Sequence, residues 1–291
     1  MSLKLKAKNT LFQILNMLPD KVGYPLYHKI QEWFDRNSIH YKINSSHNSY
    51  LTFERLAKES NISILGKSVI EIGSGWLPLM PYFFIYMGKA STVETYDLNK
   101  HYNKNNIANL NLKFSDKFGI PVKSEQNGKL NLPEGINYYP KTDLTNVELK
   151  NADLVFSRFV LEHVSPLDIK KMHQKFKEEL PEAYIIHLIS PSDHRAYVDK
   201  NLSNQDFLRY SEKEWGKNHT RFDYHNRLRL PQYLEIFEEL GYEVLFLEFE
   251  SANKDSDIYK KFKTVPLHVD YEKYSDEELT AGSINVVLKM K

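Results

Sequence analysis

The chain has 291 residues, of which 41% are hydrophobic and 26% charged, a composition ordinary for a globular protein with a full core. A formal net charge of +1 gives no general attraction to nucleic acid or anionic membranes, and the absence of cysteine excludes disulfides, thiolate metal sites and cysteine nucleophiles. No stretch approaches the roughly 20 apolar residues of a membrane span, and the N-terminus is typical of an amphipathic helix rather than a signal peptide, so we expect a cytoplasmic protein.

Apolar residues recur at three- and four-residue spacing from residue 10 to 60, which predicts N-terminal helices. Short apolar runs then alternate with amphipathic stretches. The runs that predict strands are, in chain order, KSVIEI, STVETYDLN, INYYPKTDL, ADLVFSRF, AYIIHLISP, YEVLFLEFE and SINVVLKMK. The stretches that predict helices between them are PLMPYFFIYMG, SPLDIKKMHQKFKEEL and LPQYLEIFEELG. The section from 100 to 135 is polar and rich in Asn and Lys, and no regular element is predicted in it.

This order predicts an α/β fold: a seven-stranded, mostly parallel, doubly wound sheet with an antiparallel C-terminal hairpin, plus N-terminal helices. We assign residues 1–60 to a helical extension and 61–291 to the α/β domain, with a charged and aromatic insertion at about 191–231. Ligands of such sheets bind at the carboxyl ends of the strands, so acids at those ends are candidate functional residues.

The turn after the first predicted strand carries two glycines, Gly73 and Gly75, followed by a predicted helix. Asp97 lies 22 residues beyond Gly75 at the end of the second strand, where an acid can accept hydrogen bonds from ribose hydroxyls. By themselves these residues are also compatible with a simple tight turn. Where a dinucleotide site often has a third glycine, residues 76–78 are Trp, Leu and Pro, which weakens a pyrophosphate-binding interpretation.

The motifs EIGSG, YDLN, TDL and DLVFSRFVLEHV follow one another in order, and together they resemble the class I S-adenosylmethionine-dependent methyltransferases over about residues 60–291. Further segments, among them ISPSDH and HNRLR, are similar to a bacterial subset associated with glycan and polysaccharide synthesis. The resemblance implies S-adenosylmethionine as the cofactor. The cofactor-binding residues that it implies are Glu71, Gly73, Ser74, Gly75, Asp97, Leu98, Asp143, Leu144, Ser157 and Arg158.

Methyl transfer to a hydroxyl needs a base, and polar residues that follow the fourth and fifth strands supply candidates. We expect His194 or His163 in this role, with Asp193 as an orienting group or alternative base. The alternative for His163 and its neighbour Glu162 is that they only support the turn. The spacing of these residues matches no recognised metal motif, so we predict no metal.

The insertion interleaves arginines with aromatic residues, and Tyr224, His225, Arg227 and Arg229 are the expected contacts to an anionic acceptor. A solvated insertion with salt-bridged arginines is the alternative. The expected activity is methyl transfer to a hydroxyl of a small molecule or glycan, whereas nucleic acid is disfavoured because no binding module is evident. An RNA methyltransferase and a non-catalytic scaffold are the alternatives, and the sequence leaves the oligomeric state open.

Overall fold

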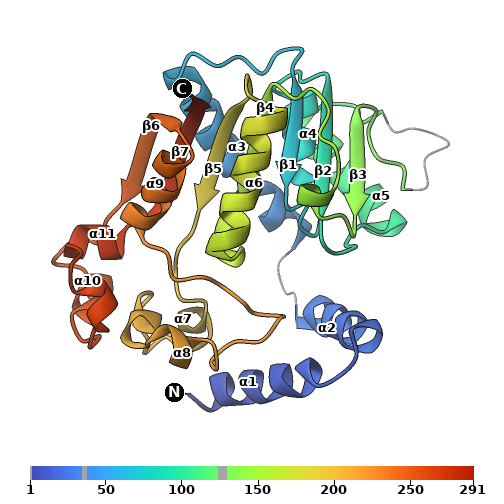
Figure 1. The fold of residues 1–291 in the computed structure, drawn as a ribbon. Helices are drawn as coiled ribbons and strands as arrows, with labels where there is room; N and C mark the ends of the chain where they lie inside the picture. The colour runs from blue at the N-terminus through green and yellow to red at the C-terminus, as the bar shows by residue number, and fades with distance from the viewer. Residues whose placement is uncertain (1, 35–37, 124–129) are drawn as a thin grey trace.

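The computed structural model describes residues 2–34, 38–123 and 130–291. Its centre is a seven-stranded sheet in the order β3-β2-β1-β4-β5-β7-β6 (Figure 1). The strands are β1 (Ser68–Ile72), β2 (Thr92–Asp97), β3 (Ile136–Pro140), β4 (Leu154–Arg158), β5 (Tyr184–Ile189), β6 (Tyr242–Glu250) and β7 (Gly282–Met290). Strands β1 to β5 pair in parallel, and β7 alone runs the other way, antiparallel to both β5 and β6. The predicted fold class is therefore confirmed.

Strand order reverses at β1, which pairs with β2 on one side and with β4 on the other. In this register Ile72 lies opposite both Tyr96 and Ser157, so the three strands end at the same edge. That edge, at the point of reversal, is where ligands of doubly wound sheets bind.

Both faces of the sheet are covered by helices because the central strands are apolar on both sides. One face packs against α3 (Ile39–Glu59), α4 (Leu79–Tyr86) and α5 (Lys104–Phe118). The other packs against α6 (Pro166–Glu179) and α9 (Leu230–Glu239). The helix α3, which belongs to the predicted N-terminal extension, shares this core with the sheet.

The helix α5 was not predicted, because its sequence is dominated by Asn and Lys. Three apolar residues at three- and four-residue spacing, Ile107, Leu110 and Phe114, nevertheless give it a narrow buried stripe. Asn103 caps its start, and Gly119 ends it in the left-handed conformation. The two caps and the buried apolar stripe therefore define this helix, although its average hydropathy does not indicate one.

The remaining helices form a group beyond the carboxyl ends of the parallel strands (Figure 1). It contains α1 (Leu3–Asn16), α2 (Asp20–Phe34) and residues 190–229, which include α7 (Arg195–Val198), η3 (Asp206–Arg209) and α8 (Glu212–Trp215). Phe12 and Leu15 of α1 pack on Phe222. The connection between β6 and β7 carries α10 (Asp257–Phe262), η4 (Val269–Tyr271) and α11 (Asp276–Thr280), which share a small core with residues 207–215. In the described part of the chain, no helix is long and apolar enough to cross a bilayer.

Candidate functional site

The loop after β1 depends on both of its glycines, for different reasons. Gly73 and Gly75 have φ of 79° and 60°, a region that residues with a side chain rarely adopt. A Cβ on Gly73 would lie 2.5 Å from Cγ2 of Val160, whereas one on Gly75 would meet nothing within 4 Å. Gly73 is therefore required by packing, while Gly75 leaves an open stretch of backbone that a ligand can approach.

Glu71 lies beneath this loop, with only 4% of its surface exposed. Its carboxyl group accepts a hydrogen bond from the Thr95 hydroxyl, whose oxygen is 2.7 Å from the hydroxyl oxygen of Ser74. Burial, reinforced by repulsion from Asp97, raises the pKa of Glu71 to about 8. Tyr102 donates to the Ser74 carbonyl at 2.9 Å, so the loop is fixed from both sides.

The Asp97 carboxylate points back to the loop and accepts the N–H of Gly75 at 3.3 Å. His101 Nε2 lies 3.4 Å from its other oxygen, and the His101 ring packs on Trp76 with centroids 4.8 Å apart. His28 of α2 contacts both rings. Trp76 therefore packs under α2 beside the Asp97 carboxylate, and α2 covers this side of the loop.

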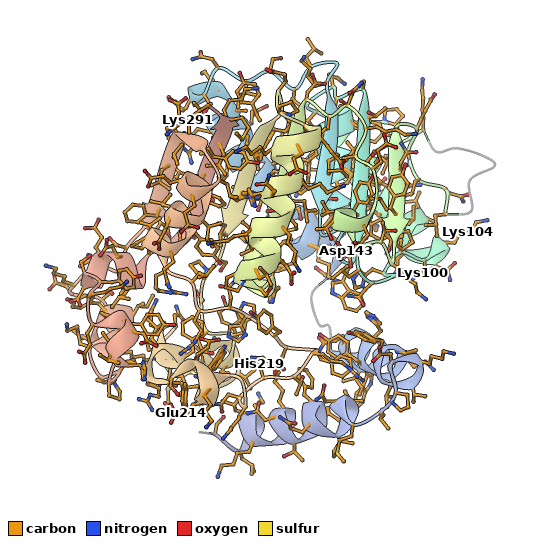
Figure 2. The ribbon with its side chains drawn as sticks, in the orientation of Figure 1. Lys100, Lys104, Asp143, Glu214, His219 and Lys291 are labelled. Atoms are coloured by element: carbon orange, nitrogen blue, oxygen red, sulfur yellow. The ribbon has the colours of Figure 1, made fainter. Side chains whose placement is uncertain are left out.

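Leu98, Asp143 and Leu144 lie farther along the same edge, where Figure 2 shows Asp143 at the end of the sheet that faces the lower group of helices. Leu98 is 68% exposed and Leu144 is buried. The Asp143 carboxylate caps the following turn, η1 (Leu144–Asn146), by accepting the N–H and hydroxyl of Thr145 at 2.9 and 2.7 Å. A ligand would share this carboxylate with the cap.

The Ser157 side chain points into the core instead of toward a ligand. Its hydroxyl is 2.7 Å from Nδ1 of His187, whose Nε2 is 3.1 Å from Nε2 of His173. His173 Nδ1 must donate to the Ile169 carbonyl at 2.8 Å, because a carbonyl can only accept. It follows that His187 donates to His173 and that Ser157 donates to His187. Ser157 can therefore contribute only its backbone to the edge of the sheet.

Arg158, the next residue, is held by the helix α3. Its Nε donates to the Ser49 hydroxyl at 2.7 Å, and its Nη2 to the Ser45 hydroxyl at 3.0 Å. The guanidinium carbon lies 4.5 Å from the ring centroid of Phe159, a residue with φ of 56°. A left-handed aromatic residue is unusual and marks a locally strained backbone directly at the strand end.

Three histidines gather beyond the ends of β4 and β5. The rings of His163 and His225 lie 4.9 and 5.0 Å from that of His194. Burial lowers the pKa of His163, and burial together with the neighbouring His163 lowers the pKa of His194 to about 3. All three are packed in one cluster, and His163 and His194 are neutral at pH 7.

The tautomer of His163 follows from its contact with a carbonyl. Nδ1 lies 3.0 Å from the Tyr224 carbonyl oxygen and must donate to it, which leaves Nε2 with a lone pair. This is the arrangement that a general base requires. Tyr224 thus meets His163 through its backbone, and His225 is buried against Trp215.

Asp193 is held in a buried ion pair. Its carboxylate accepts the backbone N–H of Arg195 at 2.9 Å and its guanidinium Nη2 at 2.6 Å. Burial alone would raise the pKa of Asp193, but its hydrogen bonds from His225 and Arg195 outweigh burial and lower it. The Asp193 carboxylate is therefore occupied by Arg195, and its expected role as an orienting group or alternative base stays a prediction.

Arg227 and Arg229 do not reach the surface, with 5% and 0% of their areas exposed. Arg227 donates to the carbonyls of Phe207 and Tyr210 and pairs with Glu212, while Arg229 lies over the Phe207 ring. Both guanidinium groups hold residues 190–229 together. The sequence gives no sign of the carbonyls that surround them, and their expected contact with an acceptor stays a prediction.

Sequence reasoning missed Ser45, Ser49 and Phe159, because neither α3 serines nor a residue with positive φ carries a recognisable spacing signal. Lys8 of α1 was missed too, although its charge acts on the His194 imidazole. Among the described residues, no group of three or more His, Asp or Glu side chains is arranged to hold a metal ion.

No protein-family model and no curated protein sequence matches the chain. Solved structures do. Magnesium protoporphyrin IX methyltransferase from Synechocystis PCC 6803, with bound S-adenosylhomocysteine, is similar at 12% identity and a TM-score of 0.49, over 98% of this chain and 99% of that one. The mitomycin 7-O-methyltransferase MmcR is similar at 11% identity and a TM-score of 0.43, over 99% of this chain and 68% of that one.

At these identities and TM-scores the likeness carries no argument by itself, and the fold is assigned from the order of the strands in the sheet. The order 3-2-1-4-5, with the last strand inserted antiparallel beside β5, carries the reversed hairpin that the sequence motifs led us to expect. The chain has a seven-stranded, doubly wound, Rossmann-like fold.

Proposed function

We propose that this protein is an S-adenosylmethionine-dependent methyltransferase whose acceptor is a hydroxyl group of a small molecule, sugars included. The observation that carries the proposal is the arrangement of Glu71, the Gly73–Gly75 backbone and Asp97 around one loop at the point where strand order reverses. The loop fits a cofactor without phosphate, because Trp76 fills the place of a third glycine and packs on His101.

In this proposal Asp97 binds the ribose hydroxyls, and the backbone at Gly75 lies along the cofactor's amino-acid portion. Asp143 and Leu144 border the adenine, as the resemblance implies, while Leu98 is open to solvent. When bound, S-adenosylmethionine would supply a methyl group on a sulfonium that is susceptible to in-line displacement. The protein's contribution is mainly to align the acceptor with that methyl group.

His163 is the proposed base. Its Nδ1–H is committed to the Tyr224 carbonyl, so the Nε2 lone pair is available to take the proton of an acceptor hydroxyl. His194 packs against it and forms a second wall of the acceptor site, with Asp193 orienting this segment through Arg195. Arg227 and Arg229 support the segment from behind rather than contact the acceptor.

Binding of S-adenosylhomocysteine tests the first half of the proposal. The ligand should raise the melting temperature, because binding to the native state alone stabilises it. Asp97→Ala should abolish this shift, whereas Asp116→Ala, which removes an exposed acid on α5, should leave it intact. No shift with the wild-type protein at saturating ligand would contradict the proposal.

Transfer of a labelled methyl group to a panel of hydroxyl compounds tests the second half. His163→Asn should lower the turnover about 100-fold or more while cofactor binding persists. If the variant turned over normally, His163 would not be the base.

A further inference from the structure

The three most exposed large apolar side chains in the described part of the chain all belong to the N-terminal helix pair, residues 3–34. They are Met17, Leu3 and Trp33, with 85%, 84% and 81% of their surfaces exposed. Further exposed apolar residues of the same pair are Ile14, Val22 and Leu26. Exposed apolar residues that gather on one part of a protein mark a site of interaction.

The helix α1 has two apolar faces. One is buried and consists of Leu5, Phe12 and Leu15. On the opposite side an uncharged, exposed stripe recurs at alternating spacings of four and three residues, formed by Leu3, Ala7, Thr10, Ile14 and Met17. A helix needs one apolar face to pack on its own protein, so the fold does not account for the second.

The helix α2 repeats this arrangement. Its inner side chains Tyr24, Tyr27 and Ile30 pack around Phe222 together with α1. Its outer residues are again spaced by four and three, and they are Val22, Leu26, Lys29 and Trp33. The outer faces of both helices are therefore available at the same end of the molecule, where Figure 1 shows α1 along the lower margin.

Contacts to the rest of the protein hold the pair in this orientation. Arg221 forms an ion pair with Asp20 at 2.9 Å and donates to the Leu18 carbonyl at 2.6 Å. The backbone N–H of Ser2 donates to Asp199 at 2.5 Å. The outer faces are thus presented by a fixed scaffold.

The charges beside the outer stripe of α1 are positive. This helix contains three lysines and no acidic residue. Lys4 and Lys6 are exposed and lie about 100° and 60° around the helix from Leu3, one on each side of the stripe. A second copy of the same face would bring these like charges together. An apolar layer with an anionic rim complements them instead.

We propose that the outer faces of α1 and α2 dock the protein on an anionic lipid surface. The aliphatic stripe would enter the layer below the headgroups, and the lysine stems would follow it while their ammonium groups meet the negative headgroups. Trp33 suits the same boundary, where tryptophan is enriched. The docking does not depend on the proposed activity. Because the inner face of α1 packs on residues 190–229, the lipid surface lies beside the acceptor end of the proposed site.

Cosedimentation with phosphatidylcholine vesicles, with and without phosphatidylserine, tests the electrostatic part. The wild-type protein should bind the phosphatidylserine vesicles more tightly, and added salt should weaken this binding. Lys4→Gln/Lys6→Gln should weaken it about 30-fold, because one lysine near an anionic surface contributes about fivefold. The control Lys150→Gln/Lys254→Gln removes two exposed lysines outside the helix pair and should change the affinity less than about twofold.

The apolar part is tested with Leu3→Gln/Met17→Gln, which should weaken binding to the same vesicles about 10- to 100-fold. Gln has a helix propensity close to that of Leu and Met, and both residues are exposed, so the melting temperature should not change. Leu65→Gln/Leu112→Gln is the matched control, since these two leucines are 68% and 65% exposed outside the helix pair.

Wild-type protein that does not bind phosphatidylserine vesicles would overturn the proposal. Binding that both helix-pair variants retain, or that the controls lose equally, would overturn it as well. Self-association in sedimentation velocity that Leu3→Gln/Met17→Gln abolishes, without vesicle binding, would assign the face to a second copy of the chain. The thermal shift with S-adenosylhomocysteine is measured without lipid, so failure of the docking and failure of the proposed function are distinguishable.

Discussion

The stability of Glu71→Gln, relative to that of the wild-type protein, should increase as the pH rises. The folded protein keeps the Glu71 proton up to a pKa of about 8, because burial disfavours the charged carboxylate, whereas the unfolded chain releases it near the ordinary value of 4.5. Between these values the folded state binds the extra proton, so the contribution of Glu71 to the free energy of unfolding falls with increasing pH. At pH 7 this difference amounts to about 3 kcal/mol. Gln resembles the protonated acid in shape and has no proton to release.

The assay is urea unfolding of both proteins at several pH values from 4 to 8. The free energy of unfolding of Glu71→Gln minus that of wild type should grow by about 3 kcal/mol between pH 4 and pH 7, whatever its starting value. Glu59→Gln, at the exposed end of α3, is the control and should show no such trend. A difference that stays constant across this range would refute the reasoning that Glu71 is buried in its neutral form.

Three further changes test the packing around the site. Ser157→Ala should cost about 1–3 kcal/mol of stability in urea unfolding, because it leaves Nδ1 of the buried His187 without its donor; an unchanged midpoint would contradict this. Gly73→Ala should destabilise much more than Gly75→Ala, which suffers only the left-handed strain of about 1 kcal/mol, and equal melting temperatures would be the contrary result. Asp193→Asn should cost about 1–3 kcal/mol, because Arg195 then keeps only Asp206 as a carboxylate partner, whereas removal of a base exposed to ligand would lower turnover alone.

The sequence predicted the sheet well because its central strands are mostly short apolar runs with a glycine, an acid or another polar residue at or just after the strand end. Asp97 and Gly73 could be placed at strand ends without coordinates, and parallel strands bring such ends to one edge. The antiparallel hairpin was predicted because the sequence shows no regular helix between the last two strands, where the structure has the short elements α10, η4 and α11. These features can be recognised from short segments of the sequence. The parallel topology then brings the strand ends together at one edge of the sheet.

Residues whose role depends on a distant partner could not be placed in this way. The side chain of Ser157 turns into the core because two histidines, His187 on β5 and His173 on α6, meet behind it. Arg229 looks like a surface cation in sequence, yet it is fully buried over the Phe207 ring. In both cases the neighbours that decide the position of the side chain are far away along the chain. The residue types alone, a serine at a strand end and an arginine, predict exposure to ligand or solvent instead of burial.

The cofactor end and the acceptor end of the proposed site also differ in how far their residues can be placed from local sequence. The cofactor end is built from strand ends of the sheet, whereas the acceptor end depends on residues 190–229 and on α1, which packs on α7 and is tied to it by the bond from the Ser2 N–H to Asp199. Lys8 reaches the His194 imidazole electrostatically only because of this docking. A scaffold with loops of this kind can keep one cofactor and vary its acceptor. Substitutions in residues 190–229 that preserve packing are therefore expected to change which acceptor is methylated, while the affinity for S-adenosylhomocysteine stays the same.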